Sequence, residues 1–116
     1  MMKHVRIVFE AQTAERDPLC VDTVLGADGK IAHQIPFAGW YGRIKSNWFR
    51  PVVFQPDGVV RFSCDPEDDY AEAHSKMNIF EVELRLGTKL ELLDLEDGES
   101  IKFMVKQIIN LDDVTV

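Results

Sequence analysis

The sequence KLELLDLEDGESIKFMVKQI, residues 89–108, decides the fold. Its first part has leucines on both sides of Glu91, and its second part alternates isoleucine, phenylalanine and valine with lysine and methionine. Alternation with a period of two residues places apolar side chains on one face of a strand and polar ones on the other. The Asp97-Gly98 pair between the two parts is a strong signal for a tight turn. The segment therefore predicts two antiparallel strands joined as a hairpin.

The same alternation recurs along the rest of the chain, in short segments separated by turn signals. Residues 26–29 and 55–58 each end in Asp-Gly. This pair suits a tight turn, because glycine accepts a positive φ. Strands joined by such turns pair as an antiparallel meander. The further alternating segments are residues 5–9, 19–25, 31–37, 52–54, 59–64 and 80–86.

One acidic segment, residues 65–74, has the features of a helix start. Asp65 is a possible N-cap, Pro66 takes the first helical position, and acids follow in the first turn. We expect one short helix near residues 66–75, or an irregular acidic loop in its place. The fold prediction is a mainly β structure, a small antiparallel β-barrel of about six to eight strands with at most one short helix. We expect it to be a single domain over residues 1–116.

Length and composition are those of one globular domain with its own core. The chain has 116 residues, of which 46% are hydrophobic and 28% charged. No apolar run approaches the roughly 20 residues that span a bilayer. The first twelve residues are typical of a strand rather than of a signal peptide. We therefore expect a cytoplasmic protein with no membrane association.

The residue types that carry nucleophilic catalysis show no local signature. Cys20 and Cys64 lie in apolar contexts and are too few for a disulfide framework, so both are expected to be buried free thiols. His4, His33 and His74 do not stand in a recognisable triad context. The sequence therefore assigns no catalytic residue.

Carboxylates on the expected strands are a separate case. Glu81, Glu83 and Glu91 occupy positions that alternate with apolar residues. Acids in such positions normally lie on the solvent face of a strand. No acid/base pair is assigned to them.

The net charge of −7 is unevenly distributed along the chain. Residues 1–64 carry eight Lys/Arg and six Asp/Glu, whereas residues 65–116 carry five Lys/Arg and fourteen Asp/Glu. An anionic surface repels phosphate backbones and attracts basic proteins. The charge therefore disfavours nucleic acid as a partner and favours a basic protein, although acidity also serves solubility alone.

Several motifs follow the order of features in a known barrel. Residues 35–40, IPFAGW, form an apolar, Gly-aromatic motif, and Arg50-Pro51 leads into an apolar strand. The final hairpin runs from LGTKLEL, residues 86–92, to FMVKQI, residues 103–108. In this order the chain resembles the C-terminal β-barrel domain of elongation factor Tu-like translational GTPases, as a stand-alone domain without the GTPase part. The resemblance implies a barrel fold and an association with translation.

The chain departs from that family in three places. Nine residues, 41–49, separate the Gly-aromatic motif from Arg50-Pro51, which the family joins directly. The acidic residues 65–72 stand where the family has a Pro-Gly-Asp turn. The chain also lacks the Gly-x-x-x-x-Gly-Lys-Ser/Thr sequence of nucleotide-binding loops, so no GTP hydrolysis is expected.

The acidic segment is the first candidate binding surface. Its carboxylates can steer and hold a basic partner. A cation site is a weaker interpretation, because the spacing of an EF-hand loop and the Cys or His pairs of zinc sites are absent. No metal or cofactor is therefore expected. The candidate partner-binding residues are Asp65, Glu67, Asp68, Asp69 and Glu72.

The second candidate surface, the aromatic-basic segment, is residues 37–54. It holds both tryptophans, six of the eleven aromatic residues and three basic residues, with no acid. Such residues anchor protein interfaces, and they also stack bases and hold phosphates. In a third interpretation the tryptophans cap the barrel core and the basic residues bond acids of the C-terminal half. The candidate partner- or anion-binding residues are Trp40, Tyr41, Arg43, Lys45, Trp48 and Arg50.

Together these patterns favour a non-catalytic binding module. We expect it to associate with a basic macromolecular partner, as an inhibitor or immunity-type protein that covers a basic site with carboxylates. The alternative is a translation- or RNA-associated accessory barrel that uses the aromatic-basic segment. A second alternative is a small enzyme with a pocket that the sequence does not reveal.

Overall fold

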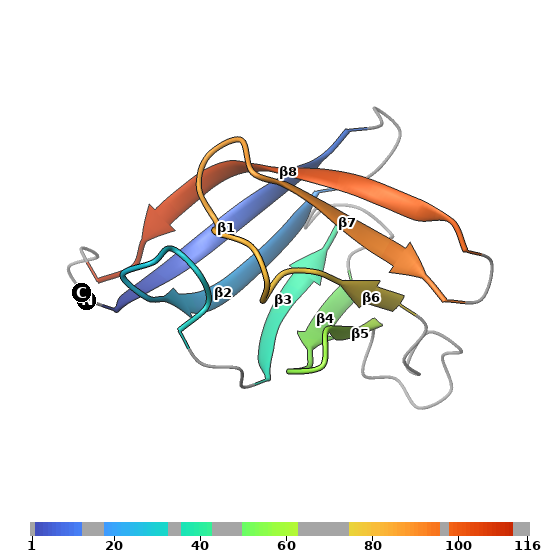
Figure 1. Ribbon diagram of the computed structural model, residues 1–116, viewed down its shortest axis with the longest axis horizontal. Coiled ribbons are helices and arrows are strands. Elements are labelled where there is room, and N and C mark those ends of the chain that lie inside the picture. Colours follow the sequence, from blue (N-terminus) through green and yellow to red (C-terminus); the bar gives the residue numbers. More distant parts are fainter. Residues whose placement is uncertain are drawn as a thin grey trace.

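The described residues form a closed antiparallel β-barrel, as the sequence predicts (Figure 1). The computed structural model describes residues 2–12, 18–32, 36–42, 50–62, 75–95 and 98–112. Within them, eight strands follow one another around the barrel in sequence order, and no helix is present that could cross a membrane. The strands are β1 (Lys3–Ala11), β2 (Leu19–Leu25), β3 (Phe37–Tyr41), β4 (Arg50–Phe54), β5 (Val59–Phe62), β6 (Ser75–Met77), β7 (Lys89–Asp94) and β8 (Ser100–Asn110).

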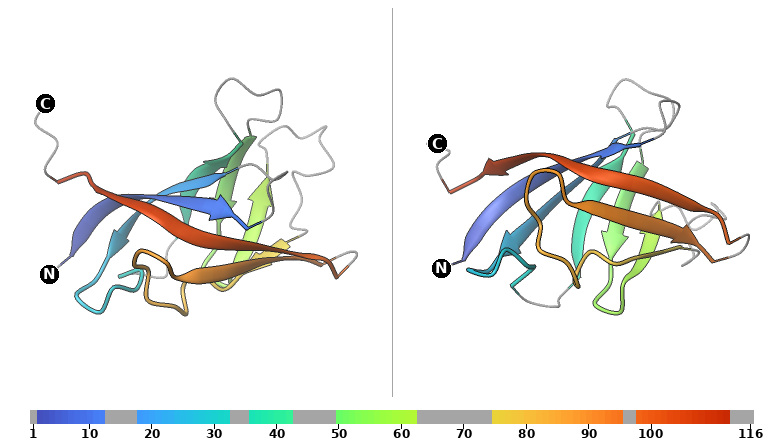
Figure 2. Two further views of the ribbon diagram at one scale, coloured as in Figure 1. Left: turned by 90° about the horizontal axis from the view of Figure 1, so that it is seen from above. Right: turned by 45° about the horizontal axis from the view of Figure 1, so that its top comes forward.

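The first and last strands close the barrel. β1 pairs with β2 on one side and with β8 on the other, so Val5 has both Thr23 and Asn110 as register partners. The pairing continues past the end of β8, where the backbone N–H of Leu111 donates to the carbonyl oxygen of His4 at 2.8 Å. Figure 2 shows the long β8 running over β1. Closure pairs both edges of every described strand, which removes the exposed edges that promote aggregation.

A β-bulge keeps apolar side chains of β8 in the core on both sides of a register shift. The β1–β8 register shifts between Val8 and Phe9, which leaves Lys106 without a register partner in β1. Before the shift the buried residues of β8 have odd numbers, as in Val105, and after it Ile108 packs against the core. One extra residue reverses the face on which alternating side chains lie. The expected strict alternation therefore ends at the bulge.

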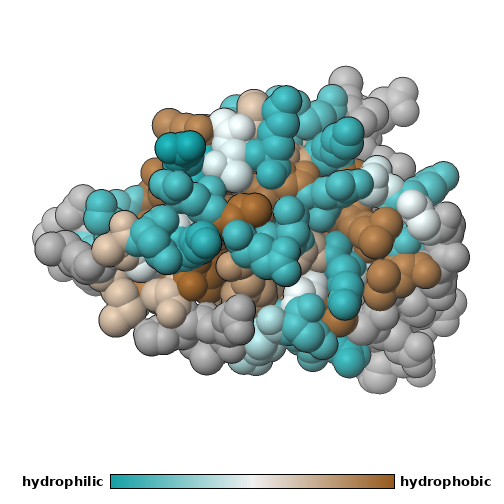
Figure 3. Space-filling view, viewed as in Figure 1, coloured by the Kyte–Doolittle hydropathy of each residue, from teal (hydrophilic) through white to brown (hydrophobic). Residues whose placement is uncertain are grey.

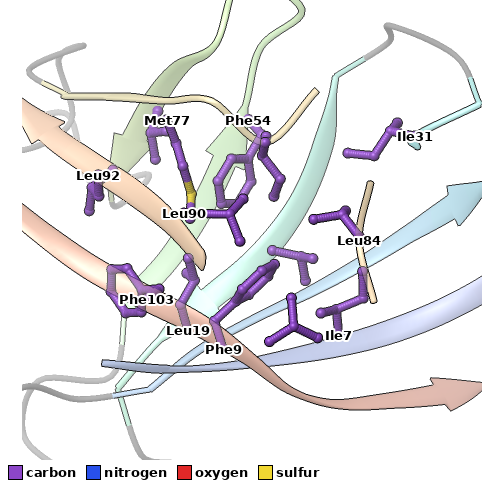
Figure 4. Close-up of a cluster of buried hydrophobic side chains, with 14 of the residues drawn as sticks. Ile7, Phe9, Leu19, Ile31, Phe54, Met77, Leu84, Leu90, Leu92 and Phe103 are labelled. Atoms are coloured by element: carbon purple, nitrogen blue, oxygen red, sulfur yellow. The ribbon is translucent and has the colours of Figure 1, made fainter. Parts of the chain in front are cut away.

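Alternate residues of the strands fill the barrel (Figure 4). In β1, Val5, Ile7 and Phe9 are buried and the residues between them are not. Phe37 of β3 stacks on Phe54 of β4 with ring centroids 4.8 Å apart. Each fully buried side chain of this size stabilises the fold by roughly 1.5–3 kcal/mol. The core also contains Leu19, Val21, Leu25, Ile31, Val52, Val60, Met77, Leu90, Leu92, Phe103 and Val105.

The segment between β6 and β7 is not the strand expected over residues 80–86. Phe80 and Leu84 are buried, but Leu86 is 67% exposed, so the alternation does not correspond to two strand faces. The Phe80 ring packs edge-on against the first residue of β3, with centroids 5.4 Å apart. The backbone N–H of Leu84 donates to the carbonyl oxygen of Gly29 at 2.8 Å. The segment therefore crosses to the turn after β2 and adds its apolar side chains to the core.

The strand expected over residues 31–37 is also replaced by a different arrangement. The turn at residues 26–29 forms as predicted, with a backbone hydrogen bond of 3.0 Å across it. Beyond the turn, Leu25 and Ile31 form an isolated bridge, and the N–H of Ala32 donates to the carbonyl oxygen of Val24 at 2.9 Å. Residues 33–35 lie outside the described part of the chain, and β2 pairs with β3 instead. Residues 37–40 of the Gly-aromatic motif therefore lie in β3, a strand of the barrel wall.

The predicted turn between β4 and β5 is confirmed, and so is the antiparallel pairing of β7 with β8, although residues 96 and 97 of the turn predicted between them lie outside the described part. In the β4–β5 turn, the backbone N–H of Gln55 donates to the carbonyl oxygen of Val59 at 2.9 Å. In the β7–β8 hairpin, the N–H of Asp94 donates to the carbonyl oxygen of Glu99 at 2.8 Å. Both turns contain the Asp-Gly pairs on which the prediction depends.

The short helix expected near residues 66–75 falls almost wholly outside the described residues. Residues 63–74 are not described, and Ser75 begins β6. This strand of three residues pairs with β5 on one side and β7 on the other. It is too short to show a period in the sequence, so no strand was predicted there.

Position 39 requires glycine because β2 and β3 approach closely there. A Cβ on Gly39 would lie against the carbonyl oxygen of Cys20 and 2.9 Å from the Cα of Val21. Both are backbone atoms of the neighbouring strand, which cannot move away without weakening the β2–β3 pairing. Gly39 is therefore a packing constraint of the barrel wall.

Hydrogen bonds between His4 of β1 and Asp112, which follows β8, add to the closure; this contact is called the clasp below. The carboxylate of Asp112 accepts the backbone N–H of His4 at 3.1 Å, and its second oxygen lies 3.0 Å from Nδ1 of the same residue. The N–H of Asp112 donates to the side-chain oxygen of Asn110 at 3.0 Å. The backbone hydrogen bond, followed by the contact with the ring, holds the pKa of Asp112 below its ordinary value.

We expect Gly39→Ala to lower the free energy of unfolding by about 1–3 kcal/mol, because the methyl group forces two strand backbones apart. Urea denaturation measures this change. Gly26→Ala is the control, since the nearest atom to its added methyl group would be a side-chain oxygen of Asp28, at 3.2 Å. Equal losses of stability in the two variants would contradict the constraint.

Stability from the clasp should be lost in acid. A carboxylate with a depressed folded pKa stabilises the fold above its unfolded pKa, about 3.9 for aspartate, and this stability is lost as the pH falls through the folded value. Asp112→Asn should therefore lower the free energy of unfolding near neutral pH, by an amount that shrinks below about pH 4. Urea unfolding at neutral and acid pH checks this, and a constant difference would count against the clasp.

Candidate functional site

Trp40, on β3, lies on the outer face of the barrel. It is half-buried and stands opposite Cys20 in the β2–β3 pairing. The guanidinium of Arg6 lies over its ring, 5.0 Å from the centroid. Arg6 alternates with the buried residues of β1, so this contact is outside the core. The interpretation in which Trp40 caps the core is therefore wrong.

Arg6 is held in a two-pronged ion pair beside this tryptophan. Its Nε lies 2.8 Å from Oδ1 of Asp22, and its Nη2 lies 3.0 Å from Oδ2. These hydrogen bonds raise the pKa of Arg6, against a smaller opposing effect of desolvation. Paired donors of this geometry satisfy a carboxylate well. The cation over Trp40 is therefore already neutralised by this chain.

The aromatic-basic segment does not form one surface in its described part. Trp40 points outward, whereas its neighbour Tyr41 packs against the core. Consecutive residues of a strand face opposite sides of a sheet, so the two rings cannot share a binding surface. The backbone of Arg50 pairs with Tyr41 in β4, but its side chain is outside the described part. Also outside it are Arg43, Lys45 and Trp48.

The acidic segment is outside the described part as well, so its proposed role stays a prediction. Its residues belong to the connection between β5 and β6. The carboxylates concerned are Asp65, Glu67, Asp68, Asp69 and Glu72.

Cys20 differs from the buried thiol that the sequence predicts. It is a free cysteine on the outer side of β2 and is only half-buried. Partial burial raises the pKa of its thiol, and the nearby positive charge of Arg6 opposes this effect. Its apolar context reflects strand neighbours, which alternate between the inside and the outside of the barrel. Cys64 lies outside the described residues.

A surface groove of about 420 Å³ runs beside the β4–β5 turn, β6, the start of the segment after β6, and β7. Its lining combines carboxylates with apolar side chains and one lysine among the described residues. Elsewhere, the face shown in Figure 3 is mainly hydrophilic, with its apolar surface broken into separate patches. The groove is lined by Pro56, Asp57, Gly58, Lys76, Met77, Asn78, Phe80, Glu81, Glu91 and Leu93.

Asn78 organises one end of the groove. Its side-chain oxygen accepts the backbone N–H of Glu91 at 3.2 Å, and its carbonyl oxygen accepts the N–H of Glu81 at 3.2 Å. The carbonyl oxygen of Gly58 accepts the N–H of Met77 at 2.9 Å, which holds the β4–β5 turn against the end of β6. Backbone contacts therefore bring residues from three parts of the chain to one wall.

The carboxylates of Glu81 and Glu91 are available for a ligand. Within the described part of the chain neither carboxylate makes a hydrogen bond or ion pair, although Glu91 stands opposite Lys102 in the β7–β8 pairing, whereas Asp57 accepts the N–H of Val59 at 3.0 Å. Lys76 is the only cation among the described lining residues. Within the described part of the chain, no group of three or more acidic, histidine or cysteine side chains could hold a metal ion. The described lining of the groove therefore carries three carboxylates and one cation.

Sequence reasoning identified these glutamates but not the site. Glu81 and Glu91 were placed on a solvent face together with Glu83, and all three are indeed exposed. Only Glu81 and Glu91 line the groove, because the segment after β6 folds back toward β7. Hydrogen bonding by Asn78 has no spacing signature, so no pattern in the sequence could have revealed it.

Comparison with known proteins adds no family to this geometry. No family model matches the chain, and no match was found among curated proteins or among solved structures. A function must therefore be inferred from the site itself.

We expect the Cys20 thiol to be alkylated with a pH midpoint above that of an ordinary cysteine, because burial raises its pKa. Arg6→Met should move the midpoint further up, since it removes the positive charge that stabilises the thiolate. Iodoacetamide labelling across a pH series, in a Cys64→Ser background, measures both midpoints. A midpoint that falls in the Arg6→Met variant would contradict this account.

Proposed function

We propose that this protein is a non-catalytic, cytoplasmic binding module that associates with a basic macromolecular partner, in the manner of an inhibitor or immunity-type protein. The observation that supports the proposal is the groove, where Asp57, Glu81 and Glu91 face a single described cation, Lys76. A groove of this charge attracts a basic side chain of a partner.

The shape of an arginine or lysine side chain fits this mixed lining. Its stem is apolar and its head is charged, so it binds best where apolar walls lead to carboxylates. Leu93 supplies the exposed apolar surface, because Met77 and Phe80 are buried beneath the groove, and Glu81 and Glu91 supply the charge. Arginine offers paired donors that match a carboxylate, and its weaker hydration makes it easier to bury than lysine.

The charge of the whole chain supports the same partner class. The net charge is −7, and residues 65–116 carry fourteen acids against five basic residues. A field of this sign accelerates encounter with a basic protein and weakens with added salt. In this proposal the acidic segment supplies steering charge, and the groove supplies the contact.

The translation- or RNA-associated alternative has less support. It depends on the resemblance to the barrel of elongation factor Tu-like GTPases and on the aromatic-basic segment. A shared fold does not transfer a function. In the described part of that segment, Arg6 covers one side of Trp40 and is itself paired with Asp22. A stacked base with a phosphate nearby would need other cations.

An enzymatic role for the groove has less support than binding. Among its described lining residues there is no serine, threonine, cysteine or histidine to act as nucleophile or imidazole base. Its carboxylates lie in an open groove, where they stay solvated. Binding of a cation needs only these carboxylates and no further catalytic group.

The binding proposal is tested with a probe peptide, acetyl-Gly-Gly-Arg-Gly-Gly-amide. We expect it to shift the NMR signals of Gly58, Met77 and Asn78, which line the groove, and to bind less tightly as salt is added. The same peptide with neutral citrulline in place of arginine should bind about tenfold more weakly or not at all, because its head group has no charge.

Variants locate the binding. The double change Glu81→Gln and Glu91→Gln should abolish the arginine-dependent shifts, since it removes both available carboxylates from the groove. Glu83→Gln is the matched control, because it removes one exposed carboxylate from the same segment but outside the groove. Equal binding of the arginine and citrulline peptides would contradict the proposal. So would a loss of binding in the Glu83→Gln control equal to the loss in the double variant.

A further inference from the structure

The groove has two unlike ends. This difference predicts which residues of the partner bind, in addition to the positive charge of the partner. At one end Asn78 holds the backbones of Glu81 and Glu91. At the other end Leu93 of β7 stands opposite Lys76 of β6 in the strand pairing. The following inference rests on the proposed function, because it takes the anionic end as the site of a basic side chain.

The end of the groove away from Asn78 presents a partly exposed aliphatic side chain. Leu93 is 37% exposed, and Leu95, two residues further along the chain, is 49% exposed. Large aliphatic side chains that remain in water next to a polar groove are typical of binding surfaces. Of these two leucines, Leu93 lines the groove, and Leu95 is not among its lining residues.

The spacing of the two ends matches an extended peptide. Glu91 and Leu93 are two residues apart on β7 and share its outer face. Two residues along a strand span about 6.6 Å, which is also the spacing of alternate side chains in an extended ligand. A partner whose basic residue lies at Glu91 therefore places its next same-side residue at Leu93.

Lys76 determines which type of partner side chain can bind at Leu93. Its ammonium makes no hydrogen bond or ion pair among the described residues, and it lines the groove beside Leu93. A second basic side chain at this end would meet a like charge, whereas an aliphatic one would pack on Leu93 and on the lysine stem. The groove therefore distinguishes one isolated basic residue from a basic run.

We propose that the groove binds an extended segment of a partner protein in which one basic side chain is followed or preceded, two positions away, by an aliphatic side chain. The carboxylates of Glu81 and Glu91 bind the basic head group. Leu93 covers the aliphatic side chain. Lys76 disfavours segments with consecutive same-side basic residues.

Synthetic peptides with the same amino-acid composition test the spacing of the two side chains. In-phase peptides have arginine and leucine two positions apart, and the out-of-phase peptide has them adjacent. The in-phase probes are acetyl-Gly-Arg-Gly-Leu-Gly-amide and its reverse, acetyl-Gly-Leu-Gly-Arg-Gly-amide. The out-of-phase probe is acetyl-Gly-Arg-Leu-Gly-Gly-amide, which puts the two side chains on opposite faces when extended. We expect the better in-phase probe to bind at least about fivefold more tightly, by NMR titration, because only it can cover Leu93. Equal affinities in both phases would overturn the inference.

Two variants and one control complete the test. Leu93→Ser should remove the in-phase advantage, whereas Leu86→Ser should keep it, because Leu86 is exposed but lies outside the groove. Replacing leucine by arginine in the probe should weaken binding to the wild type, and Lys76→Ala should restore it. Loss of the advantage in the Leu86→Ser control, or no effect of Lys76→Ala, would also overturn the inference.

The two proposals fail separately. If all arginine peptides bind through Glu81 and Glu91 with no preference for phase, the two-ended groove is wrong and the binding module stands. If no arginine peptide binds better than its citrulline form, the proposed function itself is wrong.

Discussion

Pairing between the first and last strands is the constraint on which the rest of the structure depends. β1 and β8 are the two described strands that pair across opposite ends of the chain, and the bonds between them turn an open meander into a barrel. Closure gives each strand an inside and an outside, and the bulge at Lys106 lets the longest strand follow the curvature. Once β8 is in place, β7 must pair along it, and Glu91 and Leu93 are thereby turned outward.

The segment between β6 and β7 links the core to the candidate site. Phe80 and Leu84 complete the packing, while Glu81, next to Phe80, is exposed at the groove. Asn78 joins both roles, because its hydrogen bonds shape the turn and hold β7 beside it. A change that loosens the core at Phe80 would therefore also alter the groove. Stability and binding are coupled through this short segment.

Much of the barrel could be predicted from local patterns, and the errors have a common cause. Alternation located β1, β2, β7 and β8, and Asp-Gly pairs located the turn after β2 and the β4–β5 turn. The same rule failed at residues 80–86, where burial of Phe80 depends on contact with Phe37 rather than on a strand period. Composition was also misleading, because it grouped Trp40 with Tyr41 in one candidate surface. Neighbouring residues of a strand face opposite sides of the sheet.

The sequence by itself determined the strand-forming segments, the turns, the acidic charge and the need for a single core, because these depend on residue type and short-range spacing. Only the tertiary structure decided the close approach at Gly39, the burial of Phe80 and the meeting of Asp57, Glu81 and Glu91 around one groove. These features join residues that are far apart in the chain. Their positions depend on closure and on backbone hydrogen bonds, and no local pattern records either.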